Sequence, residues 1–300
     1  MRLLVTGRTG QVVRALVEAA ADRPGLTVLP LGRPELDLAA AGDLAPLFRA
    51  HAPDVVVSAA AYTAVDQAES EPDLAFAINR DGAGAVAAAA AALAVPVIHL
   101  STDYVFDGTG IAPYRESDPT RPLSVYGRSK LAGEAAVAAA QPDHVILRTA
   151  WVYAAEGKNF LRTMLRLAAS RPEIGVVADQ HGAPTLASDI AAAVIAVAGN
   201  LVAAPDRADL RGTFHMAGAG ETTWAGFAAE IFRQSAARGG PSDVVRPITT
   251  ADYPTPAARP ANSRLDCSRL AAIHGVAMPH WQEALAQCMD RLQRQGMLAP

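Results

Sequence analysis

Tyr126 and Lys130 stand four residues apart in VYGRSKLAGE, a segment with the composition of a helix. Only two of the 26 lysine and arginine residues of the chain are lysines, so an amine here is unusual. On a helix the two side chains share a face. We expect the ammonium to lower the pKa of the phenol from about 10 and so to suit it for general acid–base catalysis. The alternative is an exposed pair that contributes about a few tenths of a kcal/mol.

A second set of polar side chains follows an apolar run in HLSTDYVFDG, residues 99–108. Ser101 and Thr102 fall where the run ends, and parallel sheets bind ligands at the carboxyl ends of their strands. A hydroxyl there can donate a hydrogen bond to a carbonyl oxygen that is becoming an alkoxide. Asp103 is next and can accept hydrogen bonds from sugar hydroxyls. A strand-ending turn is the alternative, because these residue types favour turns.

Gly7 and Gly10 lie in LLVTGRTGQVVRAL, where a short apolar run gives way to a helical pattern. Glycine permits a tight turn and a close backbone approach, and the start of a helix attracts anions. This context predicts a pyrophosphate site for a dinucleotide, with an ordinary glycine turn as the alternative. Val13 stands where a third glycine would allow close helix–strand packing. We expect valine to move the helix outward slightly without blocking the phosphate.

The segment LPLGRPELDL, residues 29–38, should contain the end of the next strand. An acid there usually binds the ribose 2′-hydroxyl of NAD, but this chain has Arg33. A guanidinium matches a phosphate bidentately, so Arg33 favours the 2′-phosphate of NADP; a solvated surface arginine is the alternative. Asp37 follows and could face the adenine.

These side chains need a scaffold, and the first half of the chain alternates between two patterns. Short apolar runs at 3–6, 26–29, 55–58, 95–100 and 144–147 predict strands. Longer stretches at 11–21, 40–51, 70–93 and 127–140 predict helices. The alternation predicts an α/β fold with a Rossmann-type, doubly wound parallel sheet.

After residue 150 the pattern loosens and proline and glycine become frequent. Helices are expected at 159–169, 187–199 and about 280–295, and a strand at 174–177. We expect residues 1–150 to form the dinucleotide-binding core, with a segment at about 174–200 returning to it. Residues 151–300 should form mainly a smaller, irregular substrate-binding lobe.

The composition excludes several classes of function. The 300 residues carry a net charge of −4 and no basic run, which argues against a nucleic-acid partner. The first apolar run is too short for a signal peptide, and the alanine-rich stretch 83–95 is short for a membrane span. We therefore expect a soluble cytoplasmic protein without a membrane partner. Cys267 and Cys288 match no metal spacing and are expected to be buried thiols.

Seven segments carry a family resemblance, in the order TGRTGQV, AAAYTAVDQAES, STDYVFDG, VYGRSKLAGE, RTAWVY, DQHGAPT and RPANSRLD. From residue 1 to about 295 the chain resembles the dTDP-4-dehydrorhamnose reductases of the extended short-chain dehydrogenase/reductase superfamily. The Tyr126/Lys130 pair indicates only the superfamily, whereas RTAWVY, GAPT and RPANSRLD are more specific. The resemblance implies NAD(P)H-dependent reduction of the 4-keto group of dTDP-4-dehydro-L-rhamnose to give dTDP-L-rhamnose.

The resemblance also implies roles for particular residues. Tyr126 would donate the proton, Lys130 would lower its pKa and bind the cofactor ribose, and Thr102 would polarise the keto oxygen. NADPH, or alternatively NADH, would be bound by Gly7, Thr9, Gly10, Gln11, Val12, Arg33, Asp37, Leu38, Ala60, Ala61, Tyr62, Thr63, Tyr126 and Lys130. The dTDP-keto-sugar substrate would be bound by Thr102, Asp103, Trp151, Arg259 and Asn262.

Some of these residues also have structural interpretations. The ring of Trp151 can stack on the apolar face of a sugar, but a core tryptophan is the alternative. Arg259, Asn262 and Arg264 could meet the diphosphate or the thymidine, or they could brace a loop. Asn79 is expected to pin neighbouring backbone, as it does in related enzymes.

Two other functions and one metal remain open. A non-catalytic NADP-binding regulatory subunit, like that of methionine adenosyltransferase, would not need an intact Thr102, Tyr126 and Lys130 set. A sugar-nucleotide epimerase would retain its NAD through the cycle. Some family members bind Mg²⁺ at a subunit contact through glutamates, but no acid cluster here has such spacing. No metal ligand is predicted, and Mg²⁺ and a homodimer rest on the resemblance alone.

Overall fold

A six-stranded parallel sheet forms the centre of the N-terminal lobe in the computed structural model, which describes residues 1–171 and 173–298. Its strand order is β10-β5-β4-β3-β1-β2, and every pairing is parallel. The chain changes direction across the sheet between β1 and β3, where α/β sheets bind ligands. The fold is therefore the predicted Rossmann-type doubly wound sheet. The strands are β1 (Arg2–Thr6), β2 (Thr27–Leu31), β3 (Val55–Ser58), β4 (Val97–Thr102), β5 (His144–Thr149) and β10 (Gly212–His215).

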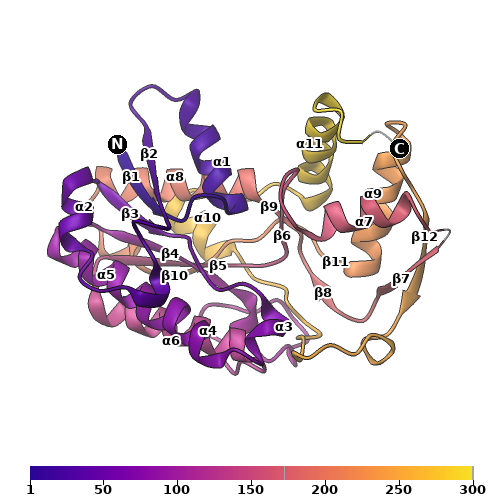
Figure 1. Cartoon of the computed structure of the whole chain (residues 1–300), viewed down its shortest axis with the longest axis horizontal. Coiled ribbons are helices and arrows are strands. Elements are labelled where there is room, and N and C mark those ends of the chain that lie inside the picture. Colours follow the sequence, from indigo (N-terminus) through magenta and orange to yellow (C-terminus); the bar gives the residue numbers. More distant parts are fainter. Residues whose placement is uncertain (172, 299–300) are drawn as a thin grey trace.

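Helices cover both faces of this sheet (Figure 1). One face carries α1 (Gln11–Ala21), α8 (Ala187–Ala203) and α10 (Ser268–His274), and the other carries α2 (Ala45–His51), α5 (Ala83–Ala92) and α6 (Val125–Ala140). Shorter helical turns connect them: η1 (Leu38–Ala40), α3 (Val65–Ala68), α4 (Pro72–Phe76), the π-helical η2 (Ala77–Gly82), η3 (Asp103–Val105) and η4 (Ala208–Leu210).

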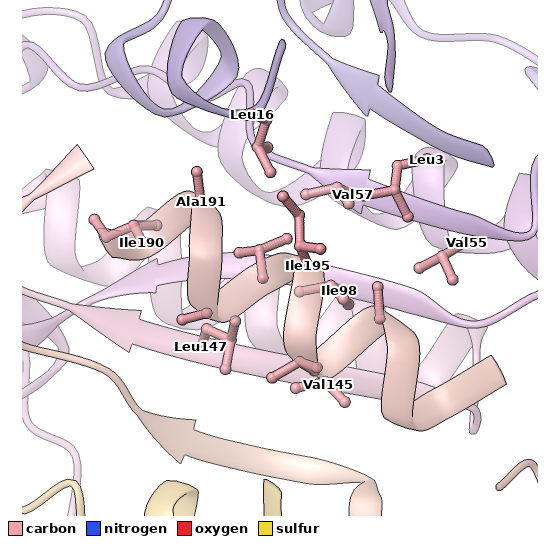
Figure 2. Packing of buried hydrophobic residues seen from close by; sticks show 14 of the residues in the cluster. Leu3, Leu16, Val55, Val57, Ile98, Val145, Leu147, Ile190, Ala191 and Ile195 are labelled. Atoms are coloured by element: carbon pink, nitrogen blue, oxygen red, sulfur yellow. The ribbon is translucent and has the colours of Figure 1, made fainter. Parts of the chain in front are cut away.

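The strands are buried on both faces because each alternates apolar side chains between two cores. Leu3 and Val5 point to the core beneath α1 and α8, whereas Leu4 points to the core beneath α2 and α5. Figure 2 shows Ile190 and Ile195 of α8 lying over the sheet in the first of these cores. Each fully buried aliphatic side chain stabilises the fold by about 1.5–3 kcal/mol.

A second lobe stands apart from the sheet, at the right of Figure 1. Helices α7 (Phe160–Ala168), α9 (Trp224–Ala236) and α11 (Trp281–Arg294) and the parallel pair β7 (Glu173–Val177) and β12 (Val244–Ile248) surround an apolar cluster that includes Leu161, Phe227 and Leu285. Two short pairs, β6 (Val152–Tyr153) with β9 (Thr185–Leu186) and β8 (His181–Gly182) with β11 (Thr222–Thr223), and the turn η5 (Thr250–Asp252) complete it.

Several sequence-based boundaries need correction. Helix α8 returns to the core as expected, but residues 174–177 do not, because β7 pairs with β12 of the second lobe. The expected helix at 40–51 begins at Ala45, and the one at 70–93 is interrupted by η2. Strand β10 and helix α9 were not predicted, and α9 gives the lobe more regular structure than expected. Residues 172 and 299–300 of the expected lobe lie outside the described residues.

Among the described residues, no helix is long and apolar enough to cross a membrane. The alanine-rich α5 packs on α6 instead. Helix α6 also lies close to η2 at Gly133, where a Cβ atom would overlap the carbonyl oxygen of Asn79. The same helix has Gly127 against the carbonyl oxygen of Tyr104. Two glycines therefore allow α6 to approach its neighbours, and α6 carries Tyr126 and Lys130.

We predict that Gly133→Ala destabilises the protein by about 1–3 kcal/mol, because the added methyl group must displace backbone of η2. Gly199→Ala is the matched control, since a Cβ there meets no atom within 4 Å and alanine favours a helix interior. The control should gain about 0.4–1 kcal/mol in urea denaturation. Equal behaviour of the two variants would contradict the close packing of α6.

Candidate active site

The turn between β1 and α1 is shaped for an anion. Gly7 has φ +103°, in the left-handed region that favours glycine. Helix α1 begins after Gly10, which makes no side-chain cap in the described structure, and its first turn contains no acid. The first N–H groups of α1 are thus available to a ligand at the positive end of the helix dipole. A pyrophosphate fits this donor set.

Val13 and Gln11 explain how this turn is held. The Val13 side chain is buried, and its Cγ2 atom lies 3.3 Å from where a Cβ of Gly7 would stand. Glycine at position 7 thus makes room for valine at position 13. The Gln11 Oε1 atom accepts a hydrogen bond from Asn159 Nδ2 at 2.8 Å. The turn between β1 and α1 is therefore linked directly to the second lobe.

The side chain of Arg8, in the turn after β1, lies beside the end of β2. Only Arg33 was predicted at this position from the sequence. A Cβ on Gly32 would stand 3.0 Å from Arg8 Cγ, and Arg8 Nη2 lies 2.6 Å from Glu35 Oε2. Arg33 is exposed beside them. The signal that could have identified Arg8 is its position inside the glycine turn, which the parallel pairing of β1 and β2 brings to the same edge.

Asp37 and Leu38, expected near the adenine, both have structural partners. Asp37 Oδ1 accepts a hydrogen bond from Ala39 N at 3.0 Å and so caps η1. The Leu38 side chain is buried in the core beneath α2 and α5. Asp37 would therefore meet adenine only through the carboxylate that also caps η1. Leu38 would meet it only through its backbone.

Asn79 fixes the segment after β3 that contains Ala60, Ala61, Tyr62 and Thr63. Its Oδ1 accepts from Tyr62 N at 2.8 Å, and its Nδ2 donates to Tyr62 O at 3.0 Å and to Ser129 Oγ at 2.9 Å. One buried amide thus holds both this segment and helix α6. The expected pinning role of Asn79 agrees with these contacts.

Thr102 and Tyr126 meet at the carboxyl end of β4. Helix α6 begins at Val125 with Ser124 as its cap, which accepts a hydrogen bond from Gly127 N at 3.1 Å. Burial raises the pKa of the Tyr126 phenol, and a hydrogen bond from Thr102 acts in the opposite direction. The ring of Tyr126 packs edge-on against Tyr104, with centroids 5.5 Å apart. The predicted hydroxyl and phenol are therefore within reach of one carbonyl oxygen.

Lys130 does not lower the pKa of Tyr126 in this structure, contrary to expectation. Its Nζ atom donates to Leu100 O at 2.7 Å and lies 3.3 Å from His99 Nε2. Burial lowers the pKa of Lys130 to about 8, against the opposing charge of Glu134. The ammonium is held against β4, and burial of the phenol outweighs the hydrogen bond from Thr102 in setting the pKa of Tyr126.

Asp103 lies behind Thr102 and is buried, with only 3% of its surface exposed. Its Oδ1 accepts from Thr102 Oγ1 at 3.0 Å, while its Oδ2 is buried without a partner among the described residues. Burial raises the pKa of Asp103 to about 6, although hydrogen bonds from Ser263 and Thr102 oppose this. The buried carboxyl does not present itself to a sugar hydroxyl, so the structure places Asp103 as a partner of Thr102.

Trp151 has both faces of its ring covered. It stacks on Trp224 with centroids 3.6 Å apart and an interplanar angle of 12°. A Cβ on Gly182 would overlap Cε2 and Cζ2 of the ring, so the Gly182 backbone covers the other face. The predicted stacking on a sugar does not fit this arrangement, because only the edge of the ring remains available.

The segment RPANSRLD divides into one residue beside the tyrosines and two that brace a loop. Arg259 Nη2 bonds Asp66 Oδ2 at 2.7 Å, and the Arg259 charge partly offsets the burial that raises the pKa of Tyr104. Asn262 donates to Gly110 O and Ala112 O and accepts twice from Arg264, so its amide is fully engaged. Asn262 braces the loop, which corrects its expected contact with substrate.

A cavity of about 490 Å³ opens in the second lobe beside Arg259. Its walls combine apolar and aromatic side chains with a few polar groups, which is typical of small-molecule sites. It is lined by Phe160, Thr163, Met164, Leu167, Arg171, Ile174, Gly175, Val176, Val177, Gln180, Trp224, Tyr253 and Arg259.

Residues 1–171 and 173–298 contain no group of three or more histidine, cysteine or acidic side chains arranged to hold a metal ion. The Mg²⁺ that the family resemblance suggests therefore has no candidate ligand set here. Cys288 is buried and Cys267 half-buried, and burial raises the pKa of both thiols.

Comparisons with known proteins agree in one family. Residues 1–294 match the family model described as the RmlD substrate binding domain. A dTDP-4-dehydrorhamnose reductase of Sinorhizobium fredii is 53% identical over 296 residues, covering 99% of each chain. The crystal structure of such a reductase from Clostridium acetobutylicum has a TM-score of 0.89 at 37% identity, covering 98% of this chain and 100% of that one. One from Bacillus anthracis, in complex with NADP, has a TM-score of 0.87 at 34% identity, covering 97% and 99%.

We predict that the stability difference between Asp103→Asn and the unsubstituted protein depends on pH. The unfolded carboxyl loses its proton near pH 3.8 and the folded one near pH 6, so ionisation destabilises the fold as pH rises through this window. From pH 4 to pH 7 the variant should gain on the order of 2–3 kcal/mol relative to the unsubstituted protein in urea denaturation.

Asp107→Asn is the matched control. Hydrogen bonds from Thr109 lower the pKa of Asp107, so its carboxylate stabilises the fold above the usual pKa and this contribution is lost as pH falls. The control should therefore lose stability relative to the unsubstituted protein as pH rises. A difference for Asp103→Asn that is flat with pH would refute the burial of an ionisable group behind Thr102.

Proposed function

This chain belongs to the dTDP-4-dehydrorhamnose reductase family, and from that premise we propose that it reduces the 4-keto group of dTDP-4-dehydro-L-rhamnose with NADPH to give dTDP-L-rhamnose. One observation carries the proposal beyond the family. The Thr102 hydroxyl at the carboxyl end of β4 lies close enough to the Tyr126 phenol to lower its pKa against the larger effect of burial, on the sheet edge where α1 offers its free N–H groups. A regulatory protein without catalysis would not need this pair.

The proposed chemistry uses each side chain for one task. When bound, the reduced nicotinamide supplies the hydride. The hydroxyl of Thr102 would turn from Asp103 to donate a hydrogen bond to the keto oxygen as negative charge develops there. The phenol of Tyr126 gives its proton to that oxygen, which becomes the new sugar hydroxyl. The raised pKa of Tyr126 supports this direction, because the phenol holds its proton until an oxyanion is present.

Lys130 would bind the cofactor ribose and hold positive charge beneath Tyr126. Two of its hydrogen bonds run to β4, which leaves one N–H for a ligand. This role requires that Lys130 stay charged, although burial brings its pKa to about 8.

The remaining predicted residues would position the two ligands. Backbone from Gly7 to Val12, including Thr9 and Gln11, would hold the pyrophosphate, and Ala60 to Thr63 would border the nicotinamide ribose. Asp37 and Leu38 would flank the adenine. Arg259 and the cavity beside it would take the sugar nucleotide, with the edge of Trp151 toward the sugar, because a guanidinium matches a diphosphate and an apolar wall matches a base.

We predict that Tyr126→Phe lowers kcat by about 10²–10⁴-fold, because the variant lacks the proton donor. NADPH affinity, measured by fluorescence titration, should stay within about threefold, since the phenol is not expected to supply most of the binding energy. Tyr114→Phe is the matched control, because that hydroxyl bonds Asp107 and Gly110 in a loop outside the site. Turnover of Tyr126→Phe at the rate of the control would remove Tyr126 from the mechanism.

We predict that Arg8→Ala and Arg33→Ala each weaken NADPH binding about tenfold or more while changing NADH binding little, because each removes a guanidinium from the 2′-phosphate position. Arg23→Ala, an exposed arginine beyond the end of α1, is the matched control. Dissociation constants for both cofactors decide the outcome. An equal loss for NADH and NADPH would show that neither arginine reads the 2′-phosphate.

A further inference from the structure

A buried polar chain runs from α6 through β4 to β3. The Lys130 Nζ atom lies 3.3 Å from His99 Nε2, and His99 Nδ1 lies 3.0 Å from Ser58 Oγ. All three side chains are at most 2% exposed. Ser58 and His99 are register partners on neighbouring parallel strands, so the sheet fixes their spacing. Of these three residues, only Lys130 was identified from the sequence.

The hydrogen-bonding capacity of Lys130 determines the state of His99. An ammonium has three N–H donors and no acceptor. The Leu100 carbonyl takes one donor at 2.7 Å, and His99 Nε2 can take a second only if that nitrogen carries no proton. The proton of the neutral ring is then on Nδ1, where it donates to Ser58 Oγ. Burial and the charge of Lys130 lower the pKa of His99 well below 6.5, so the ring is neutral.

The other charged groups around Lys130 do not replace this acceptor. Glu134, one turn further along α6, acts on Lys130 through its charge and is already ion-paired with Arg148 of β5 at 2.7 Å. It also accepts from Ser101 at 2.6 Å. The Tyr126 phenol lies beside Thr102, and the Tyr62 hydroxyl donates to Glu71 Oε2 at 2.8 Å. Among the described side chains, His99 is therefore the hydrogen-bond acceptor of the ammonium.

We propose that His99 is a positioning residue for the reductase: it keeps Lys130 charged and aims the third N–H of Lys130 at the cofactor, and Ser58 fixes the tautomer that makes this possible. The role rests on the proposed function for its use in turnover, but the state of Lys130 is testable without turnover. His99 touches neither reacting atoms nor substrate in this role. It acts through Lys130 alone.

The composition of the chain makes a direct measurement simple. Lys130 and Lys158 are its only lysines, so lysine labelled with ¹³C at Cε gives two resonances, and Lys158→Arg assigns them. Lys158 is exposed and serves as an internal reference. The Lys130 resonance should titrate near pH 8 in the unsubstituted protein.

Three variants separate the possibilities. His99→Leu removes the acceptor and should lower the Lys130 midpoint by about one pH unit, because a hydrogen bond to a charged group is lost. Ser58→Ala removes the partner of His99 Nδ1, so the tautomer of His99 is no longer fixed. The Lys130 midpoint should then fall by less than it does in His99→Leu. His99→Gln can offer an amide oxygen near the position of Nε2 and should restore the midpoint to within about 0.3 units. The Lys158 resonance should be the same in all three variants.

The kinetic counterpart follows the same order. The alkaline limb of kcat for the keto-sugar nucleotide should move to lower pH in His99→Leu, giving about fivefold less activity at pH 8 and about twofold less at pH 7 if the midpoint falls by one unit. His99→Gln should recover the profile. A merely structural role would lower kcat equally at all pH values and would not be rescued.

The two hypotheses fail separately. The reductase assignment fails if the unsubstituted protein does not turn over the keto-sugar nucleotide, whatever the titration midpoint of Lys130. The role of His99 is overturned if the Lys130 midpoint does not move in His99→Leu, or if His99→Gln moves it as far. If His99→Leu does not fold, the other two variants decide. The role of His99 is then overturned if the Lys130 midpoint is unchanged in Ser58→Ala and displaced in His99→Gln.

Discussion

The burial of one ammonium, that of Lys130, is the constraint on which the arrangement of the site depends. A charge removed from water must find hydrogen-bond partners, or its pKa shifts until it is neutral. Leu100 and His99 of β4 supply these partners at 2.7 and 3.3 Å. Helix α6 must therefore lie close to the sheet, and Gly127 and Gly133 allow this by presenting no side chain to Tyr104 and Asn79. The position of Tyr126 follows from the same helix.

The two lobes are joined at several points around the crevice. Arg291 of α11 bonds Glu18 of α1 and Glu156 at 2.6 Å each, and Gln11 bonds Asn159 beside the cofactor turn. On another side, Asp66 of α3 pairs with Arg259. These contacts are half-exposed, so each contributes modestly. Their effect is geometric, since they hold the turn between β1 and α1 and the cavity beside Arg259 in a defined relation.

The electrostatics of the site favour a proton donor over a base at Tyr126. Asp103 and Lys130 are buried and Tyr126 is partly buried, and the loss of water shifts the pKa of each so that its neutral form is favoured. A phenol that keeps its proton is suited to supply it to a developing alkoxide. The expectation of a lysine that acidifies the phenol treated the pair as solvated neighbours on a helix, and the desolvation of both groups was not visible in their spacing.

The sequence by itself determined the order of strands and helices in the first half, the anion-binding turn, and the residues that gather at the end of β4. These signals are local, because periodicity, glycine placement and i, i+4 spacing act within a few residues. Tertiary structure decided which surfaces those residues face. Strand β10 has no apolar run of its own and exists because it pairs with β5. Arg8 reaches the end of β2, Trp151 is covered by Trp224 and Gly182, Asn262 braces a loop, and Asp103 and His99 are buried. Each depends on contacts between residues distant in the chain, whose desolvation and packing no local pattern encodes.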